Sequence, residues 1–350
     1  MNMKQMTIGE NIIGKDHRTY IVAELSANHD QRFDKAVHII EAAKASGADA
    51  VKLQTYTPDT MTIDCETDIF KIRGTIWNGR NLYQLYKEAF TPWEWHPKLQ
   101  TTAQKIGIDL FSTPFDASAV DFLDKMNVPA FKVASFENVD IPLLKKIART
   151  GKPIIMSTGM ASLAEIDEAV NTIRTEGNDQ IALLKCTSAY PAPPEEINLN
   201  TIAHMAKAFD VPIGLSDHTM GSAVAVAAIA LGARVVEKHF TLSRNDPGPD
   251  SPFSMEPREF KQMVDDIRTV EKALGTVSYN LTTKQKESAS FRRSLFVVKD
   301  IKTGDRFSEE NIRSIRPGYG LHTRHLDEIL GKKAQLDLPK GTPLEWRHIG

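Results

Sequence analysis

The sequence predicts an α/β protein, a (β/α)8 TIM barrel followed by a small β-rich C-terminal domain. Three observations predict this fold. Eight short apolar runs alternate with amphipathic helical stretches over roughly residues 15–275. The runs are continuously apolar rather than alternating, which is typical of strands buried on both faces. A polar, unpatterned segment then precedes a stretch of short strands and turn signals.

The barrel strands are expected where the apolar runs lie, with helices between them. Helical patterns occupy the intervals, for example residues 33–47 and 162–177, and the second closes on a glycine suited to a C-cap. A doubly wound sheet uses the same βαβ units and is the alternative fold. The expected strands span residues 19–25, 49–56, 109–115, 130–135, 153–158, 181–188, 211–218 and 235–240.

Residues 57–90 interrupt the regular alternation with a long insertion after the second strand. The insertion leaves the carboxyl end of that strand, where barrel enzymes keep their active sites. Long loops at such places are more often functional than idle. We therefore expect this segment to take part in the site.

The chain divides into three parts on these patterns. Residues 1–275 form the expected barrel, residues 276–290 a polar linker and residues 291–350 a separate C-terminal domain. The turn signals "KTGD" and "PKGT" fall in the last part. About sixty residues are enough for a small domain that is marginally stable alone.

Composition excludes several classes of protein. Among 350 residues, 43 Lys and Arg face 45 Asp and Glu, for a formal net charge of −2. Binding to nucleic acid or to an acidic membrane surface favours a basic excess, so neither is expected. The two cysteines, Cys65 and Cys186, allow one disulfide but do not suggest a disulfide scaffold. Without a membrane-length apolar run or a signal-peptide core, we expect a cytoplasmic protein.

Polar residues gather at the carboxyl ends of the expected strands. In a barrel, all of these ends meet at one mouth. The residues are Glu24, Asn28 and His29; Lys52 and Gln54; Ser112 and Thr113; Lys132, Ser135 and Glu137; Ser157 and Thr158; Thr187, Ser188 and Tyr190; Ser216, Asp217 and His218; and Glu237, Lys238 and His239.

This ring of residues has two chemical halves. Lys52 and Lys132, with several hydroxyls, suit an anion such as phosphate. His218 and His239 suit a divalent metal left partly open to substrate, and Glu24 could complete the ligation or act as a base. Other interpretations remain open: a Schiff-base lysine, serines that only cap helices, or histidines held in structural hydrogen bonds.

Beyond these general patterns, an ordered set of motifs resembles the sialic acid synthase family, which condenses phosphoenolpyruvate with an N-acetylated amino sugar. The resemblance covers essentially the whole chain, and the C-terminal part, with "RRSLFVVKDIKTGD" and "IRPGYGL", is similar to the antifreeze-like (SAF) domain of that family. The motifs are "AELSANH", "VKLQTY", "FSTPFD", "FKVASFEN", "GKPIIMSTGM", "LLKCTSAYP", "GLSDHT", "EKHFT" and "GPDSPFSMEP".

Particular versions of the motifs indicate a branch of the family. "ELSANHDQ", "KLQT" and "CTSAYP", with "WNGRNLYQLYKEAFTPWEWH", resemble the branch that takes 2,4-diacetamido-2,4,6-trideoxy-L-altrose. The N-acetylneuraminate and legionaminate branches are the alternatives. Residue 188 is usually asparagine in the neuraminate enzymes, so the contact at Ser188 is altered here.

The resemblance implies a role for each matching residue. His218 and His239 correspond to the metal ligands and act in catalysis with Glu24 and Glu137. The residues matching the phosphoenolpyruvate site are Lys52, Ser112 or Thr113, Lys132, Ser135, Ser157, Ser188 and Ser216. The residues matching the sugar side are Gln54, Tyr190, Asp250 and Arg316.

The resemblance also implies a cofactor and partners. Manganese is the expected metal, and magnesium and cobalt also fit histidine with oxygen ligands. Arg316 resembles the arginine that the antifreeze-like domain of a partner subunit inserts into the barrel mouth, which implies a domain-swapped homodimer. The sugar product usually ends on flagellin, capsule or lipopolysaccharide. Two further functions stay open: a carbohydrate- or ice-binding module on an inactive barrel, and a metal aldolase that uses free pyruvate.

Overall fold

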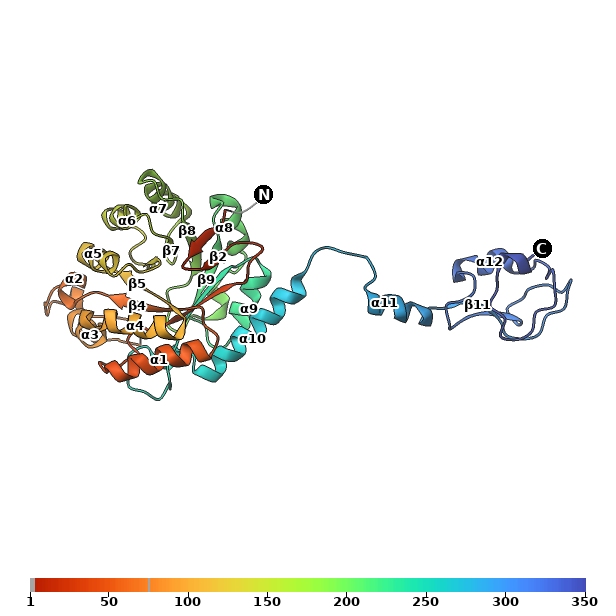
Figure 1. The fold of residues 1–350 in the computed structure, drawn as a ribbon, viewed down its shortest axis with the longest axis horizontal. Coiled ribbons are helices and arrows are strands. Elements are labelled where there is room, and N and C mark those ends of the chain that lie inside the picture. The colour runs from red at the N-terminus through yellow and green to blue at the C-terminus, as the bar shows by residue number, and fades with distance from the viewer. Residues whose placement is uncertain (1–3, 75) are drawn as a thin grey trace. The chain divides into compact units, whose positions relative to one another are not determined.

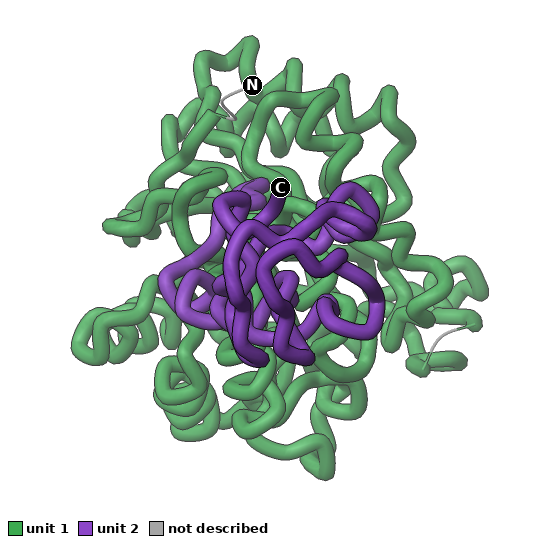
Figure 2. The backbone as a smooth tube through the Cα atoms, turned by 90° about the vertical axis from the view of Figure 1, so that its right-hand side faces the viewer, with its two compact units in different colours: residues 1–275 green, residues 276–350 purple. Residues whose placement is uncertain are grey.

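The computed structural model describes residues 4–74 and 76–350 of the chain. They form two compact units, residues 1–275 and 276–350, which are coloured separately in Figure 2. In the first unit, eight parallel strands close into a barrel in the order β10-β3-β4-β5-β6-β7-β8-β9. The predicted (β/α)8 fold is therefore confirmed, and the doubly wound alternative is wrong because the sheet closes on itself.

The barrel strands coincide with the eight predicted apolar runs, and most of their residues are buried. Figure 1 shows the helices arranged around these strands. The strands are β3 Tyr20–Glu24, β4 Ala50–Thr55, β5 Asp109–Pro114, β6 Phe131–Val133, β7 Ile154–Ser157, β8 Ile181–Cys186, β9 Ile213–Asp217 and β10 Val235–His239. The helices that follow them are α1 Phe33–Ala45, α4 His96–Ile106, α5 Ala117–Lys125, α6 Ile141–Ala148, α7 Leu163–Thr175, α8 Thr201–Phe209, α9 Ala223–Ala230 and α10 Pro257–Leu274.

Local sequence explains where these helices begin and end. At α7, the Ser162 side chain accepts a hydrogen bond from the backbone N–H of Glu165, whose own carboxylate accepts from the backbone N–H of Ser162. Gly177 then takes a φ of +87°, a conformation that L-residues rarely adopt, just beyond the end of the helix. The glycine expected to end this helix therefore does so.

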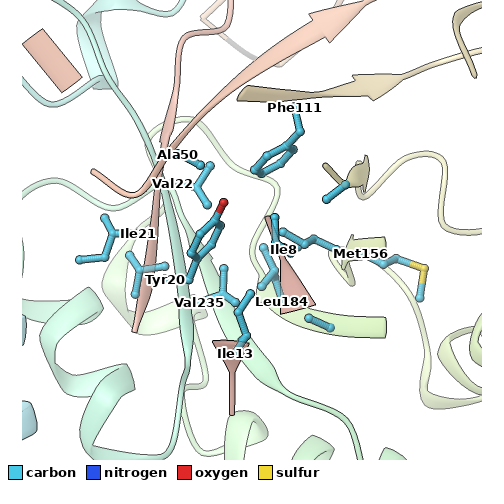
Figure 3. Close-up of a cluster of buried hydrophobic side chains, with 14 of the residues drawn as sticks. Ile8, Ile13, Tyr20, Ile21, Val22, Ala50, Phe111, Met156, Leu184 and Val235 are labelled. Carbon is cyan, nitrogen blue, oxygen red and sulfur yellow. The ribbon is translucent and has the colours of Figure 1, made fainter. Parts of the chain in front are cut away.

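An N-terminal hairpin, β1 Met6–Ile8 and β2 Asn11–Ile13, closes the end of the barrel opposite the site. Asn11 donates to Asp109 at the start of β5 (3.0 Å), and the backbone N–H of Thr7 donates to Gln180 just before β8 (3.2 Å). Figure 3 shows Ile8 and Ile13 of the hairpin among core side chains of the barrel. The sequence did not predict this hairpin.

The insertion after β4 contains two short helices, α2 Pro58–Met61 and α3 Leu82–Ala89. The Asn81 side chain caps α3 by accepting from the backbone N–H of Tyr83 (2.8 Å), and it donates to the Cys65 carbonyl (2.8 Å). The insertion is therefore an ordered layer. Short 3-10 turns lie at η1 Asp68–Phe70, η2 Trp93–Trp95, η3 Pro194–Glu196 and η4 Ser251–Phe253.

The second unit is a small β-rich domain with its own apolar core. Its strands β11 Ser294–Val297 and β12 Ile312–Ile315 pair antiparallel. Leu295, Phe307 and Leu344 are among its buried side chains. A short helix α12, Leu326–Ile329, and the 3-10 turns η6 Thr323–His325 and η7 Trp346–His348 complete the domain.

The expected linker is not wholly irregular. Helix α11, Thr283–Ser288, and the turn η5, Ala289–Phe291, lie within and just after it. Thr282 caps α11 in a capping box with Gln285, a local signal that the polar composition concealed. The helix buries no residue, so it belongs to neither apolar core.

Candidate functional site

A cavity of about 400 Å³ lies at the carboxyl ends of the barrel strands. Strand residues line one part of it, and the insertion after β4 lines another. This is the end of a barrel where side chains from different strands converge. The lining residues on the strands or just after them are Lys52, Gln54, Lys132, Ser135, Ser157, Cys186, Ser216, His218, Glu237 and His239.

Two lysines and two carboxylates form a buried lysine–carboxylate cluster (Glu24, Lys52, Lys132 and Glu237). The Nζ atom of Lys52 lies 2.8 Å from Glu24 Oε2 and 3.2 Å from Glu237 Oε1. Lys132 Nζ lies 3.8 Å from the same Glu237 oxygen. Charges this deeply buried must be paired, and here two cations face two anions.

Burial and pairing shift the pKa values within the lysine–carboxylate cluster. Burial, opposed by Lys52, raises the pKa of Glu24 to about 7. Burial, aided by the charge of Lys52 and opposed by Glu237, lowers the pKa of Lys132 to about 8. For Lys52, burial is outweighed by the two carboxylates, which hold its pKa above the ordinary value. Lys132 is thus the cation of the pair that can lose its proton near neutral pH.

Hydroxyl groups surround Lys132. Its Nζ donates to Ser157 Oγ (2.7 Å), and Ser135 Oγ accepts from the backbone N–H of Gly159 (3.1 Å). A Cβ at Gly159 would lie 2.3 Å from Ser188 Oγ and 2.6 Å from Ser135 Oγ, so only glycine leaves room for both hydroxyls. Lysine ammonium, serine hydroxyls and a bare glycine together form a cradle suited to an anion.

The two histidines face each other at the middle of the cavity, with ring centroids 5.4 Å apart. His218 donates from Nδ1 to the Thr187 carbonyl (3.0 Å), so its Nε2 can bind a metal only when the ring is neutral. Burial favours the neutral ring, but Cys186 and the Thr187 carbonyl outweigh it and raise the pKa of His218. His239 Nδ1 is buried and has no hydrogen-bond partner among the described residues. Burial and the neighbouring His218 and Lys52 hold the pKa of His239 well below its usual range, which keeps the ring neutral.

A neutral imidazole with a free nitrogen can bind a metal ion. The pair His218 and His239 therefore fits a divalent cation whose remaining ligands are water or substrate oxygens. Within residues 4–74 and 76–350, no group of three or more His, Cys, Asp or Glu side chains could enclose such an ion. A metal ion held by His218 and His239 alone would take its remaining ligands from water or substrate.

Two further carboxyl groups lie at the cavity. Burial raises the pKa of Glu137 to about 7, and its Oε2 has no partner among the described residues. Asp250 accepts a hydrogen bond from Ser26, and burial raises its pKa as well. Gln54 donates to Glu24 Oε1 (3.1 Å), which joins Gln54 to the lysine–carboxylate cluster.

Not every predicted residue reaches the cavity. Ser112 Oγ lies 2.6 Å from Thr55 Oγ1, which in turn contacts His96, on the outer side of the strand. The neighbouring Thr113 Oγ1 lies 3.5 Å from Lys52 Nζ. Of the two residues predicted for one contact, the structure thus brings Thr113 and not Ser112 to the lysine. Arg316 is an exposed residue of the second unit.

Sequence reasoning left Gly159 and Cys186 out of the site, and it placed Glu237 at the barrel mouth without giving it a role. Glu237 precedes His239 by two residues on β10, and side chains two apart share a face of a strand, so this spacing could have indicated one. Cys186 Sγ lies 3.9 Å from His218 Nδ1, and both cysteines of the chain are free. Gly159 carried no signal apart from its place after a strand.

A second buried pair lies behind the histidines. Lys238 Nζ lies 2.6 Å from Asp217 Oδ2 and donates to the Thr219 carbonyl (2.6 Å). Asp217 precedes His218 and Lys238 precedes His239, and the two residues are register partners between β9 and β10. The pair therefore joins the two strand ends that carry the histidines.

These features can be compared with known proteins. The NeuB family matches residues 39–279, and the SAF domain matches residues 292–350. The chain therefore belongs to the NeuB family, which confirms the family that the ordered motifs indicated.

Its relatives include a pseudaminic acid synthase of Campylobacter jejuni, 46% identical over 94% of this chain and 96% of that protein. An N,N'-diacetyllegionaminic acid synthase of the same species is 40% identical over 91% and 96%. The crystal structure of N-acetylneuraminic acid (sialic acid) synthetase from Leptospira borgpetersenii, in complex with citrate, matches with a TM-score of 0.73 and 30% identity, covering 82% of this chain and 95% of that one.

The structure was also searched for membrane-spanning helices. None of the helices in the described ranges is both long and apolar enough to cross a bilayer.

Proposed function

We propose that the protein is a pseudaminic acid synthase, which condenses phosphoenolpyruvate with 2,4-diacetamido-2,4,6-trideoxy-L-altrose and water to give pseudaminic acid and phosphate. The observation that carries the proposal is one cavity that holds Lys52, Lys132 and serine hydroxyls beside the open pair His218 and His239. The 46% identity to a pseudaminic acid synthase supports the choice of sugar.

The anion cradle is the proposed phosphoenolpyruvate site. Lys132 is held between Ser157 Oγ (2.7 Å) and Glu237 (3.8 Å), and Lys52 between Glu24 and Glu237. Without a ligand, Glu24 and Glu237 neutralise the two lysines. The phosphate and carboxylate of phosphoenolpyruvate would also pair with the ammonium groups of Lys52 and Lys132. Ser135 and Ser188, beside Gly159, would donate their hydroxyl protons to the same anion.

His218 and His239 are the proposed metal ligands, with manganese expected and magnesium or cobalt also suited to histidine and oxygen donors. The metal, when bound, supplies Lewis-acid polarisation of the sugar aldehyde. The two rings are already 5.4 Å apart, and the hydrogen bond from His218 Nδ1 to Thr187 fixes the orientation of one of them.

The reaction requires a base for water as well as an anion site. Carbon 3 of phosphoenolpyruvate bonds to the aldehyde carbon, whose oxygen takes up a proton. Water adds at carbon 2 and gives a proton to a carboxylate, and the C2–O bond to phosphate then breaks. Glu137 is suited to accept that proton because its pKa is about 7 and its Oε2 is free. Glu24, with a similar pKa, is the second carboxyl able to do so.

On this mechanism neither lysine forms a Schiff base, because phosphoenolpyruvate brings its own latent enolate. Gln54, Tyr190 and Asp250 would contact the sugar. We also propose that Arg316 of a second copy of the chain completes the mouth in a domain-swapped homodimer, as the resemblance implies.

The test is phosphate release from phosphoenolpyruvate by purified, metal-reloaded protein. The diacetamido altrose sugar, N-acetylmannosamine and the legionaminate precursor are offered in parallel, each with and without chelator. Metal-dependent release with the altrose sugar supports the proposal. Preference for the legionaminate precursor would favour the second candidate function, a legionaminate synthase, which the 40% identical relative supports.

Two controls separate the remaining alternatives. Free pyruvate in place of phosphoenolpyruvate, offered with the sugar and metal, would reveal a metal aldolase by product formation without phosphate. Borohydride trapping in the same reaction would reveal a Schiff-base lysine by a covalent adduct at Lys52 or Lys132. An absence of phosphate release with every sugar, although metal binds, would instead favour a binding module on an inactive barrel.

A further inference from the structure

The insertion after β4 forms one wall of the cavity, and that wall is apolar. Every residue that segment 57–90 contributes to the lining is apolar or aromatic. The segment also carries many charged side chains, from Asp59 to Glu88, and among the described residues none of them lines the cavity. We call the lining residues of this segment the apolar wall. They are Met61, Ile72, Trp77, Leu82, Leu85, Tyr86 and Ala89.

Helix α3 supplies most of the apolar wall from a single face. Leu82, Leu85, Tyr86 and Ala89 stand at positions i, i+3, i+4 and i+7, the spacing of one helical stripe. The exposed side chains of α3, such as Gln84, lie on the opposite face. The apolar face of α3 therefore borders the cavity.

This stripe lies outside the main apolar core of the barrel, although Tyr86 contacts the buried ring of Tyr56 edge-to-face (centroids 5.7 Å apart). The large apolar cluster of the barrel, including the side chains packed around its edge, contains none of the apolar-wall residues. An amphipathic helix normally buries its apolar face in a core. Here the apolar face of α3 borders a cavity of about 400 Å³. We therefore expect it to contact an apolar part of the ligand that binds in this cavity.

The apolar wall lies close to the histidines. The Trp77 indole donates to the Pro249 carbonyl (3.2 Å), and its ring centroid is 5.8 Å from that of Tyr190. The Tyr190 ring is in turn 4.4 Å from His218. A sugar whose aldehyde lies at the histidines would therefore extend its far end along the apolar wall.

We propose that the apolar wall selects sugars that carry a methyl group at carbon 6, and so distinguishes 6-deoxy diacetamido sugars from sugars with a hydroxyl there. This inference rests on the proposed function. The methyl groups at carbon 6 and on the acetamido groups bury apolar surface against α3. A hydroxyl at carbon 6 would lose its water against a wall whose hydrogen-bonding side-chain atoms are the Tyr86 hydroxyl and the Trp77 indole N–H, and the indole already donates to the Pro249 carbonyl.

The discrimination shown by known apolar pockets sets the magnitude of the expected selectivity. Such pockets discriminate against an added hydroxyl by on the order of 100-fold.

The test is binding, measured by calorimetry with the full chain in the presence of manganese and phosphoenolpyruvate, which an alditol without an aldehyde cannot consume. The ligands are the borohydride-reduced, open-chain forms of the diacetamido 6-deoxy sugar and of its 6-hydroxy analogue, which differ by one oxygen. Wild-type protein is expected to bind the 6-deoxy alditol on the order of 100-fold more tightly. In Leu82→Ser the preference should fall about tenfold, and in Leu82→Met, which keeps an apolar side chain, it should remain.

Gln84→Ser is the matched control, because it puts the same residue type into the same helix on the exposed face. It should bind both alditols as the wild type does. Equal binding of the two alditols by wild-type protein, or equal weakening of both by Leu82→Ser, would overturn the inference. A 6-deoxy preference in binding without phosphate release would leave the inference standing and refute the proposed synthase activity instead.

Discussion

Removing one partner of the buried pair Asp217–Lys238 is expected to destabilise the barrel strongly, which Lys238→Met would test. The ammonium and carboxylate are 2.6 Å apart, and their side chains are 2% and 0% exposed. Asp217 Oδ1 also accepts from the backbone N–H (2.9 Å) and the hydroxyl (2.8 Å) of Thr219. Methionine matches the length of lysine but leaves the Asp217 carboxylate buried without its counter-ion.

Removing one partner of a buried ion pair costs about 3–5 kcal/mol. For a unit of this size, each kcal/mol lowers the melting temperature by roughly 2–4 °C, so a fall of roughly 6–20 °C is expected. The double variant Asp217→Asn/Lys238→Met removes both charges and should be more stable than Lys238→Met alone. Thermal and denaturant unfolding of the barrel, followed by circular dichroism, measures these differences.

Lys261→Met is the matched control for this prediction. Lys261 and Asp265 are also 2.6 Å apart, but their side chains are 53% and 54% exposed. An exposed pair contributes about 0–1 kcal/mol, so this variant should melt close to the wild type. If Lys238→Met and Lys261→Met shifted the melting temperature equally, burial would not set the strength of the pair and the reasoning would be refuted.

Three further predictions concern the site. His239→Ala should lower manganese affinity at least tenfold by calorimetry, and unchanged affinity would contradict the metal assignment. Gly159→Ala should raise KM for phosphoenolpyruvate about tenfold, since its Cβ would displace the hydroxyls of Ser135 and Ser188, while KM for the sugar stays constant. As pH increases, kcat/KM should rise through pH about 7, where Glu137 ionises, and fall above pH about 8, where Lys132 loses its charge. Lys132→Arg should move the alkaline limb to higher pH, because arginine keeps its charge. A pH profile without either limb would exclude both roles.

Much of the fold was predictable because apolar runs of strand length leave a strong signal. The eight barrel strands each fall within a predicted run. The hairpin β1–β2 escaped because strands of three residues are too short to show a period. Helix α11 escaped because its residues are polar on every side and only its capping box marks it.

The site was predictable to the level of strand ends but not of strand faces. Ser112 and Thr113 are adjacent polar residues, and only the register of β5 against β4, which pairs Thr113 with Gln54, decides which one faces inward. Glu237 was expected at the mouth but was given no role, although it shares a face with His239. Segment 57–90 was expected to take part in the site, but the sequence did not show which of its residues line the cavity, since an amphipathic helix gives no sign of whether its apolar face meets a core or a ligand.

The hairpin β1–β2 closes the end of the barrel opposite the site, and this constrains the order in which the substrates bind. Ile8 and Ile13 of the hairpin, with Tyr20 and Phe111, are buried there, so in the described part of the chain the cavity can exchange its contents only through the mouth (Figure 3). The proposed anion site is built from the strands, whereas the apolar wall is built from the loop above them. A ligand of the strands must therefore enter first and leave last, so steady-state kinetics should be sequential and ordered, with phosphoenolpyruvate as the leading substrate.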